Sequence, residues 1–312
     1  MDLKNKKILV TGAHGFLGKH LVKKLIEEQG VLRENLFLPN IEELDLRKLE
    51  DCQVAVKNQD IVIHLAAKVG GIGFNQEKPG ELFYDNIIMG TQLIEAARQE
   101  RVKKFVAIGT VCAYPKETPV PFREEDLWLG YPEETNAPYG LAKKMLLVQG
   151  IAYRQQYGFN SIFLLPLNLY GPGDNFDPKS SHVLAAIIKK VNDAKRENKD
   201  YIELWGTGRA TRGFLYVEDA SQGIILATKN YEKPDPVNLG YELEISIKDL
   251  AELVCNLMDF KGEIRWDTTK PDGQPRRSLD VSKAEKEFNF RAETNFKDGL
   301  KRTIDWYEST QK

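Results

Sequence analysis

The amino-acid sequence predicts an α/β protein: a Rossmann domain, with a doubly wound parallel sheet, followed by a smaller mixed α/β lobe. Short, nearly all-apolar runs alternate with longer segments whose apolar residues recur at helical spacing. A glycine-rich loop separates the first such run from the first helical segment. Strands that are apolar on both faces are typical of a parallel sheet covered by helices on both sides.

The first half of the chain supplies the alternating elements. Leu17, Leu21 and Leu25 repeat at helical spacing in the first helical segment. The last helix of this half also carries apolar residues outside its main stripe, such as Leu146 and Ile151, which favour either a subunit contact or packing inside the monomer. The predicted strands lie at 7–11, 36–38, 61–65 and 104–109, and the predicted helices at 16–29, 81–99 and 138–157.

The pattern changes after residue 165, where prolines and glycines mark a long irregular stretch. Helices are predicted near 181–194 and at 246–258, the second with Ser246 as its N-cap. We therefore expect a dinucleotide-binding domain at 1–166 and a substrate-binding lobe at 167–312. The apolar segment within 214–230 is expected to pack back on the first domain.

The composition excludes several classes of function. With 44 Lys+Arg against 46 Asp+Glu among 312 residues, the chain lacks the basic excess that binds nucleic acid. No apolar run approaches the ~20 residues that cross a bilayer, and no signal peptide is visible, so no membrane partner is expected. Cys52, Cys112 and Cys255 form no CxxC pair, which argues against a disulfide framework or a metal site and favours the cytoplasm.

The glycine-rich loop has the pattern TGxxGxxG, with glycines at Gly12, Gly15 and Gly18. Glycines allow a tight turn and a close backbone approach, and the N-terminus of the following helix favours a pyrophosphate. Because the loop lies between a predicted strand and a predicted helix, it predicts dinucleotide binding.

The residues after the second predicted strand bear on the type of dinucleotide. An acidic residue after the second strand usually bonds the ribose of NAD, but here acids come only at Glu42 and Glu43. Its absence favours NADP. No arginine follows that strand to hold a 2′-phosphate, although His14 and Arg33 are candidates, so NAD stays open as an alternative.

A second motif, YxxxK, places Tyr139 and Lys143 on one face at the start of a helix. A phenol has an ordinary pKa of ~10, and a nearby ammonium group lowers it by favouring the anion. Gly109 and Thr110 end a predicted strand, where the threonine hydroxyl can share a substrate oxygen with the phenol. Together with the glycine loop, these residues predict a nicotinamide-dependent enzyme.

With these motifs the chain resembles the extended short-chain dehydrogenase/reductases, and within them the GDP-L-fucose synthase family. The resemblance runs from residue 8 to about residue 280, nearly the whole chain. HLAAKVGGI, CAYPK and SHV are more specific than the superfamily motifs. The matching segments are 64–72 (HLAAKVGGI), 112–116 (CAYPK), 168–172 (NLYGP), 174–176 (DNF), 181–183 (SHV), 205–208 (WGTG), Arg212, 270–273 (KPDG) and 275–276 (PR).

The resemblance implies a bifunctional enzyme that inverts C3 and C5 of GDP-4-keto-6-deoxy-D-mannose and then reduces C4 with NADPH, giving GDP-L-fucose. It implies Cys112 as the base and His182 as the acid of epimerisation, and Thr110, Tyr139 and Lys143 as the groups that act at C4. It also implies a homodimer through helices near 81–99 and 138–157.

The resemblance assigns binding residues too. Those for the cofactor are Gly12, His14, Gly15, Phe16, Leu17, Gly18, Ala66, Gly109, Tyr139, Lys143, Pro166, Asn168, Leu169 and His182; those for the substrate are Lys190, Trp205, Arg212 and Asp272. Trp205 has an alternative interpretation as a core residue of the second lobe.

The chain also departs from the family pattern. Lys190 stands where an arginine is frequent, Gly213 where a glutamate is common, and Thr110 where the family has serine. The family's arginines near the 2′-phosphate are replaced by His14 and Pro39.

Three alternatives remain at this point. The first is a related enzyme acting on another GDP-4-keto sugar, such as a heptose or a colitose precursor. The second is a redox-neutral nucleotide-sugar epimerase, against which Cys112 and His182 argue. The third is a catalytically silent NADP-binding regulator, against which Thr110, Tyr139 and Lys143 argue.

Overall fold

The computed structural model describes residues 1–270 and 272–311, so Pro271 of the 270–273 motif lies outside the described residues. A six-stranded parallel sheet has the order β10-β5-β4-β3-β1-β2, which confirms the predicted fold class. Ile8 pairs with Leu36 on one side and Ile61 on the other. The strands are β1 (Ile8–Thr11), β2 (Leu36–Phe37), β3 (Ile61–His64), β4 (Lys104–Ile108), β5 (Ser161–Pro166) and β10 (Val237–Leu239).

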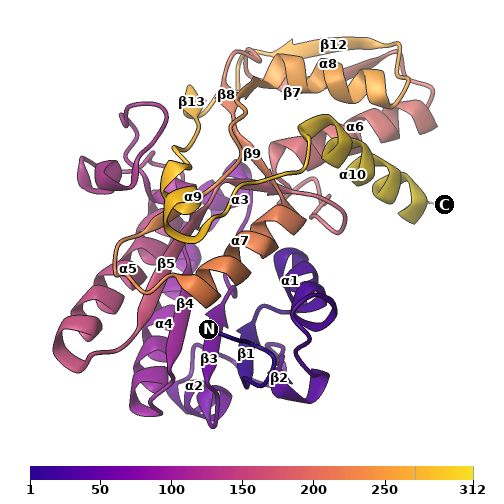
Figure 1. Ribbon diagram of the computed structural model, residues 1–312. Helices are drawn as coiled ribbons and strands as arrows, with labels where there is room; N and C mark the ends of the chain where they lie inside the picture. Colours follow the sequence, from indigo (N-terminus) through magenta and orange to yellow (C-terminus); the bar gives the residue numbers. More distant parts are fainter. Residues whose placement is uncertain (271, 312) are drawn as a thin grey trace.

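Helices cover both faces of this sheet (Figure 1). One face carries α2 (Leu49–Val56), α4 (Pro79–Gln99) and α5 (Ala137–Tyr157), and the other carries α1 (Phe16–Glu27) and α7 (Val217–Asn230). The predicted helices of the first half are therefore confirmed to within two residues at each end. The long helix α5 starts with a proline in its first turn and ends at Gly158, whose φ of 66° gives the left-handed cap.

The sheet has a topological switch point between β1 and β3. The chain leaves β1 toward α1 on one face, whereas after β3 it continues through α3 (Ile72–Glu77) to α4 on the other face. In such sheets the carboxyl ends of the two strands border a ligand-binding crevice. The glycine loop and Ala66 lie at this point.

A second apolar core lies at the other end of the molecule, where Figure 1 shows α6, α8, β7 and β12 together. Its helices are α6 (Val183–Arg196), α8 (Ile247–Leu257) and α10 (Phe296–Thr310). As predicted, Ser246 caps α8, because its hydroxyl accepts from the Asp249 amide at 3.0 Å. The strand pairings are β7 (Tyr201–Trp205) with β12 (Glu263–Asp267), β6 (Asn168–Tyr170) with β9 (Phe214–Tyr216), and β8 (Thr211–Arg212) with both β11 (Ile245–Ser246) and β13 (Arg276–Arg277).

The chain crosses between the two cores more often than its pattern indicates. Besides α7, strand β10 and helix α9 (Ser282–Phe288) pack in the first core, with Phe290 beside them. The boundary at residue 166 therefore stays a prediction. Over the described part of the chain, none of the helices has the length and apolar character needed to cross a bilayer.

Candidate active site

The glycine loop forms a close-fitting cradle at the carboxyl ends of β1 and β3. A Cβ atom on Gly18 would lie 2.2 Å from the carbonyl oxygen of Gly12, and one on Gly12 would lie 2.8 Å from the amide nitrogen of Ala66. Gly12 also has a φ of 70°. Gly15 stands at the N-cap of α1, so the first amides of that helix lack intrahelical acceptors. This cradle fits the pyrophosphate of a dinucleotide.

The end of β2 offers one candidate partner for the ribose of such a ligand. The exposed His14 ring is held by a 2.9 Å hydrogen bond between Nε2 and the carbonyl of Leu38. Arg33 turns back instead and donates to the carbonyl of Leu36 at 3.0 Å. The Asn40 carboxamide accepts from the amides of the two following glutamates, which closes that loop on itself.

Thr110 and Tyr139 meet where β4 ends and α5 begins. The Thr110 hydroxyl accepts from the Cys112 amide at 3.2 Å and caps the 3₁₀ turn Val111–Ala113. Gly140 allows the first turn of α5 to pack on this turn, since a Cβ there would lie 2.3 Å from the Cys112 carbonyl oxygen. Tyr139 and Lys143 follow at the expected helical spacing.

Burial governs the titration of this pair. Burial, assisted by Cys112, raises the pKa of the Tyr139 phenol, and interaction with the Thr110 hydroxyl only partly offsets the rise. The expectation that Lys143 would bring that pKa toward neutrality is therefore wrong for the free protein, because desolvation of the phenolate dominates. Burial also lowers the pKa of Lys143, whose side chain is 2% exposed, to about 8.

Cys112 is the half-buried member of the three free cysteines; Cys52 and Cys255 are buried. Its Sγ accepts from Nη1 of Arg277 across 3.6 Å. His182 stands at the N-cap of α6, accessible to solvent. Desolvation by surrounding protein atoms, together with the charge of Arg277, lowers the pKa of His182. Arg277 therefore acts on both predicted epimerisation residues.

Arg277 is the site residue that sequence reasoning missed. In β13 its side chain is buried, while the neighbouring Arg276 is exposed and pairs with Glu244 at 2.9 Å. Successive side chains of a strand point to opposite faces, so only one of two adjacent arginines can turn inward. The arginine pair after the KPDG motif was a usable signal, but the resemblance extended only to Arg276.

The predicted substrate residues come from four places in the second lobe. Trp205, at the end of β7, is 53% exposed, so it is not a core residue. The Asp272 carboxylate accepts from the Thr207 amide at 2.6 Å and hydroxyl at 2.8 Å. Arg212 donates to the Gln274 carbonyl at 2.6 Å, and its pKa is lowered to about 10 by burial and by Arg277. Lys190 donates to the Glu203 carbonyl at 2.6 Å.

Gly213 explains one departure from the family pattern. A Cβ there would lie 2.6 Å from Cδ2 of Leu167, so no larger residue fits without displacement. Its amide donates to the Arg277 carbonyl at 2.8 Å, and its carbonyl accepts from Asn168 Nδ2 at 2.8 Å. These bonds join the strands that carry Asn168, Arg212 and Arg277. Pro166 ends β5, and Leu169 packs partly buried against the first core.

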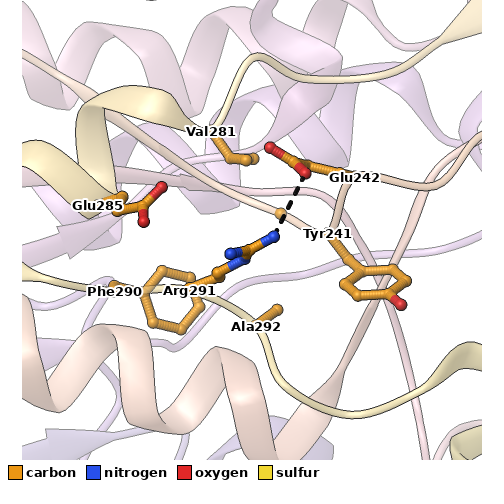
Figure 2. A pocket seen from close by; sticks show the side chains of 8 residues that line it. Tyr241, Glu242, Val281, Glu285, Phe290, Arg291 and Ala292 are labelled. Atoms are coloured by element: carbon orange, nitrogen blue, oxygen red, sulfur yellow. Dashed lines mark ion pairs between the residues drawn. The ribbon is translucent and has the colours of Figure 1, made fainter.

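A separate surface pocket of about 170 Å³ lies elsewhere (Figure 2). Figure 2 shows the Arg291 side chain facing Glu242, with 3.9 Å between their charged groups. The lining residues are Gly240, Tyr241, Glu242, Val281, Glu285, Phe290, Arg291 and Ala292. None of the predicted site residues is among them. Within the described chain, no cluster of three or more His, Cys, Asp and Glu side chains is arranged to hold a metal ion.

Comparison with known proteins identifies a matching family and similar relatives. Residues 8–240 match the model of the NAD dependent epimerase/dehydratase family. A putative GDP-L-fucose synthase 2 of Arabidopsis thaliana is 40% identical over 306 residues, covering 97% of this chain and 92% of the relative.

Two solved structures share the fold at 27% identity. A GDP-L-fucose synthetase from Naegleria fowleri bound to NADP superposes with a TM-score of 0.85 over 99% of this chain and 95% of the other. A GDP-6-OMe-4-keto-L-xylo-heptose reductase from C. jejuni superposes with a TM-score of 0.91 over 98% and 99%.

Proposed function

The chain belongs to the NAD dependent epimerase/dehydratase family, in the branch that contains the curated GDP-L-fucose synthases, and we propose that it converts GDP-4-keto-6-deoxy-D-mannose to GDP-L-fucose. The reaction epimerises C3 and C5 and reduces C4 with NADPH. The observation that carries the proposal is that the predicted epimerisation residue Cys112 lies next to the predicted reductase residues Thr110 and Tyr139. Cys112, the predicted epimerisation base, is hydrogen-bonded through its amide to Thr110, beside Tyr139 of the reductase set.

Epimerisation needs a base, an acid and a stabilised enolate. The hydroxyls of Thr110 and Tyr139 donate to the C4 oxygen, so the protons on C3 and C5 become acidic. Cys112, as thiolate, removes the proton from one face of the carbon and becomes a thiol. His182 returns a proton to the opposite face, and the pair then exchanges protons with water to repeat the cycle at the second carbon.

Reduction uses the same C4 oxygen. When bound, NADPH would supply the hydride to C4. Tyr139 then gives its phenolic proton to the C4 oxygen, and its raised pKa keeps that proton in place until the alkoxide forms. The Lys143 ammonium stabilises the phenolate left behind and would hold the nicotinamide ribose.

The remaining cofactor residues would hold the dinucleotide at the switch point. Gly12, Gly15 and Gly18 would cradle its pyrophosphate, and His14 would bind the adenosine ribose. The backbone of Ala66, Gly109, Pro166, Asn168 and Leu169 would contact the nicotinamide end. The missing acid after β2 supports NADP over NAD.

The second lobe holds the GDP moiety. Trp205 offers an exposed aromatic face for stacking, and the guanidinium of Arg212, fixed by backbone carbonyls, suits a diphosphate. Lys190 adds a second cation and Asp272 orders the loop beside Trp205.

The proposal includes a homodimer in the cytoplasm. Helices α4 and α5 pack against each other and expose Phe83, Tyr84, Val148 and Ile151, each at least 41% accessible. A second copy of the same helix pair would cover this apolar face. The free cysteines favour a reducing compartment.

One experiment tests the reaction. The protein is incubated with GDP-4-keto-6-deoxymannose in D2O, with NADPH or NADH, while cofactor absorbance and product NMR are followed. We expect cofactor oxidation with deuterium at C3 and C5 of the product. Oxidation without deuterium would leave a plain reductase, and deuterium without oxidation would leave a redox-neutral epimerase.

The second candidate function is reduction of another GDP-4-keto sugar, favoured by the likeness to the C. jejuni heptose reductase. A GDP-4-keto-heptose tested in parallel decides between the two substrates by their kcat/KM values.

A further inference from the structure

Arg277 makes three directed contacts from a buried position. Nη1 donates to Sγ of Cys112 at 3.6 Å, while Nε and Nη2 donate to Oε1 of Gln274 at 3.3 and 3.2 Å. Its side chain is 9% exposed, and among the described residues no carboxylate pairs with it. The positive charge of this guanidinium is therefore not neutralised by a protein anion.

Gln274 holds that guanidinium in place. The side chain is 6% exposed, and its Nε2 donates to the carbonyl of Lys116 at 3.1 Å. With Oε1 toward Arg277 and Nε2 toward Lys116, one carboxamide joins the arginine to the loop that follows Cys112. Its backbone carbonyl also accepts from Arg212. Both the oxygen and the nitrogen of the carboxamide are therefore hydrogen-bonded, as expected of a buried amide that holds its neighbours in place.

We propose that Gln274 and Arg277 are positioning residues for the epimerisation base: Gln274 fixes Arg277, and Arg277 stabilises the thiolate of Cys112. This inference rests on the proposed function, in which Cys112 removes the proton from C3 and C5. A thiol abstracts a proton only as its thiolate, and a cation in contact with the sulfur favours that form.

Other charged and titratable groups also lie near Cys112. Cys112 influences the pKa of Arg212, in β8, and that of Tyr139, in α5. His182, at the start of α6, faces Arg277. Arg277 is the one among these whose donor contacts Sγ, so its removal has the largest expected effect.

The test is alkylation of the free protein by iodoacetamide, followed at each cysteine by mass spectrometry from pH 5.5 to 10. Cys112 supplies the signal, because burial raises the pKa of Cys52 to about 12 and that of Cys255 to about 11. In Arg277→Met we expect the alkylation rate at pH 7 to fall at least ~10-fold and its midpoint to move up by ~1 pH unit or more. Arg277→Lys recovers part of the rate.

Gln274→Glu separates the charge effect from a purely structural one. It keeps an acceptor for Arg277 but adds a negative charge that competes with the thiolate, so the midpoint again moves upward. The matched control is Arg276→Met, which removes the neighbouring outward-facing charge and leaves the profile unchanged. An unchanged rate at high pH shows that access to the sulfur is the same in all variants.

The inference is overturned if Arg277→Met and Gln274→Glu, both folded by circular dichroism, keep the wild-type profile. If Arg277→Met does not fold, the alkylation profiles of Gln274→Glu and Arg277→Lys test the inference without it. Deuterium incorporation by the wild-type enzyme is scored separately. Incorporation without an alkylation shift refutes the positioning pair alone, and an alkylation shift without incorporation refutes the proposed reaction.

Discussion

Gly140 packs against the backbone of Cys112 so closely that a Cβ atom would lie 2.3 Å from the Cys112 carbonyl oxygen. Because glycine has no side chain, the first turn of α5 packs directly on the turn that follows β4. This contact is therefore the reason that the proposed reductase residue Tyr139 and the proposed epimerase residue Cys112 share one site. The chemistry of either step is testable by removing one group at a time.

Tyr139→Phe is expected to slow C4 reduction by ~10²-fold or more, because the alkoxide loses its proton donor. NADPH binding, measured by fluorescence titration, should stay within twofold of wild type. Deuterium exchange should fall less than reduction, since Thr110 still donates to the C4 oxygen. A wild-type reduction rate would refute the assignment of Tyr139 as the acid.

Cys112→Ala is expected to abolish deuterium incorporation at C3 and C5 while the unepimerised ketone is still reduced. The physical reason is that the carbon acid loses its base, whereas the proton donor at C4 is intact. Product NMR in D2O measures both outcomes in one sample. Cys255→Ala is the matched control, and incorporation at the wild-type level in Cys112→Ala would contradict the role.

The reduction step should depend on the charge of Lys143. Burial penalises its ammonium form, so the folded protein releases this proton near pH 8, below the ordinary pKa of ~10.4. The charge is present below about pH 8 and is lost above it, so kcat/KM for reduction should fall as pH rises through this value. Tyr139, whose pKa is raised, keeps its proton over the same range. A flat profile up to pH 9.5 would be inconsistent with this role.

Gly18→Ala should weaken NADPH binding at least ~10-fold and destabilise the fold by ~1–3 kcal/mol, because the new methyl group overlaps the Gly12 carbonyl. Isothermal titration and thermal unfolding measure the two effects. Gly80→Ala is the control, since nothing lies within 4 Å of a Cβ built there. Equal behaviour of the two variants would argue against the cradle.

Ile151→Glu should convert the proposed dimer to a monomer, because it places a charge in the apolar face of α4 and α5. Its thermal stability should change little in the monomer, as the side chain is already 41% exposed. Light scattering after size-exclusion chromatography measures the mass. Leu32→Glu, at another exposed apolar residue, should leave the mass unchanged, and a monomeric wild type would refute the dimer.

Much of the fold was predictable from local pattern. Apolar runs identified β1, β3 and β4, and Leu17, Leu21 and Leu25 identified α1, because burial imposes these periodicities on the chain. The short strand β10 was missed, since three residues carry too little periodicity and its place is decided by pairing with β5.

The features of the candidate site likewise separate into those set by local sequence and those set by tertiary contacts. The sequence by itself determined the glycine loop, the helical spacing of Tyr139 and Lys143, and the position of Thr110 at the end of a strand. These features depend on contacts between residues near in the chain.

The tertiary structure alone decided that burial raises the pKa of Tyr139, that Trp205 is exposed, and that Arg277 contacts a sulfur 165 positions away. Desolvation and such distant contacts arise only when β13 pairs with β8 and the two cores come together, and no local pattern encodes that pairing.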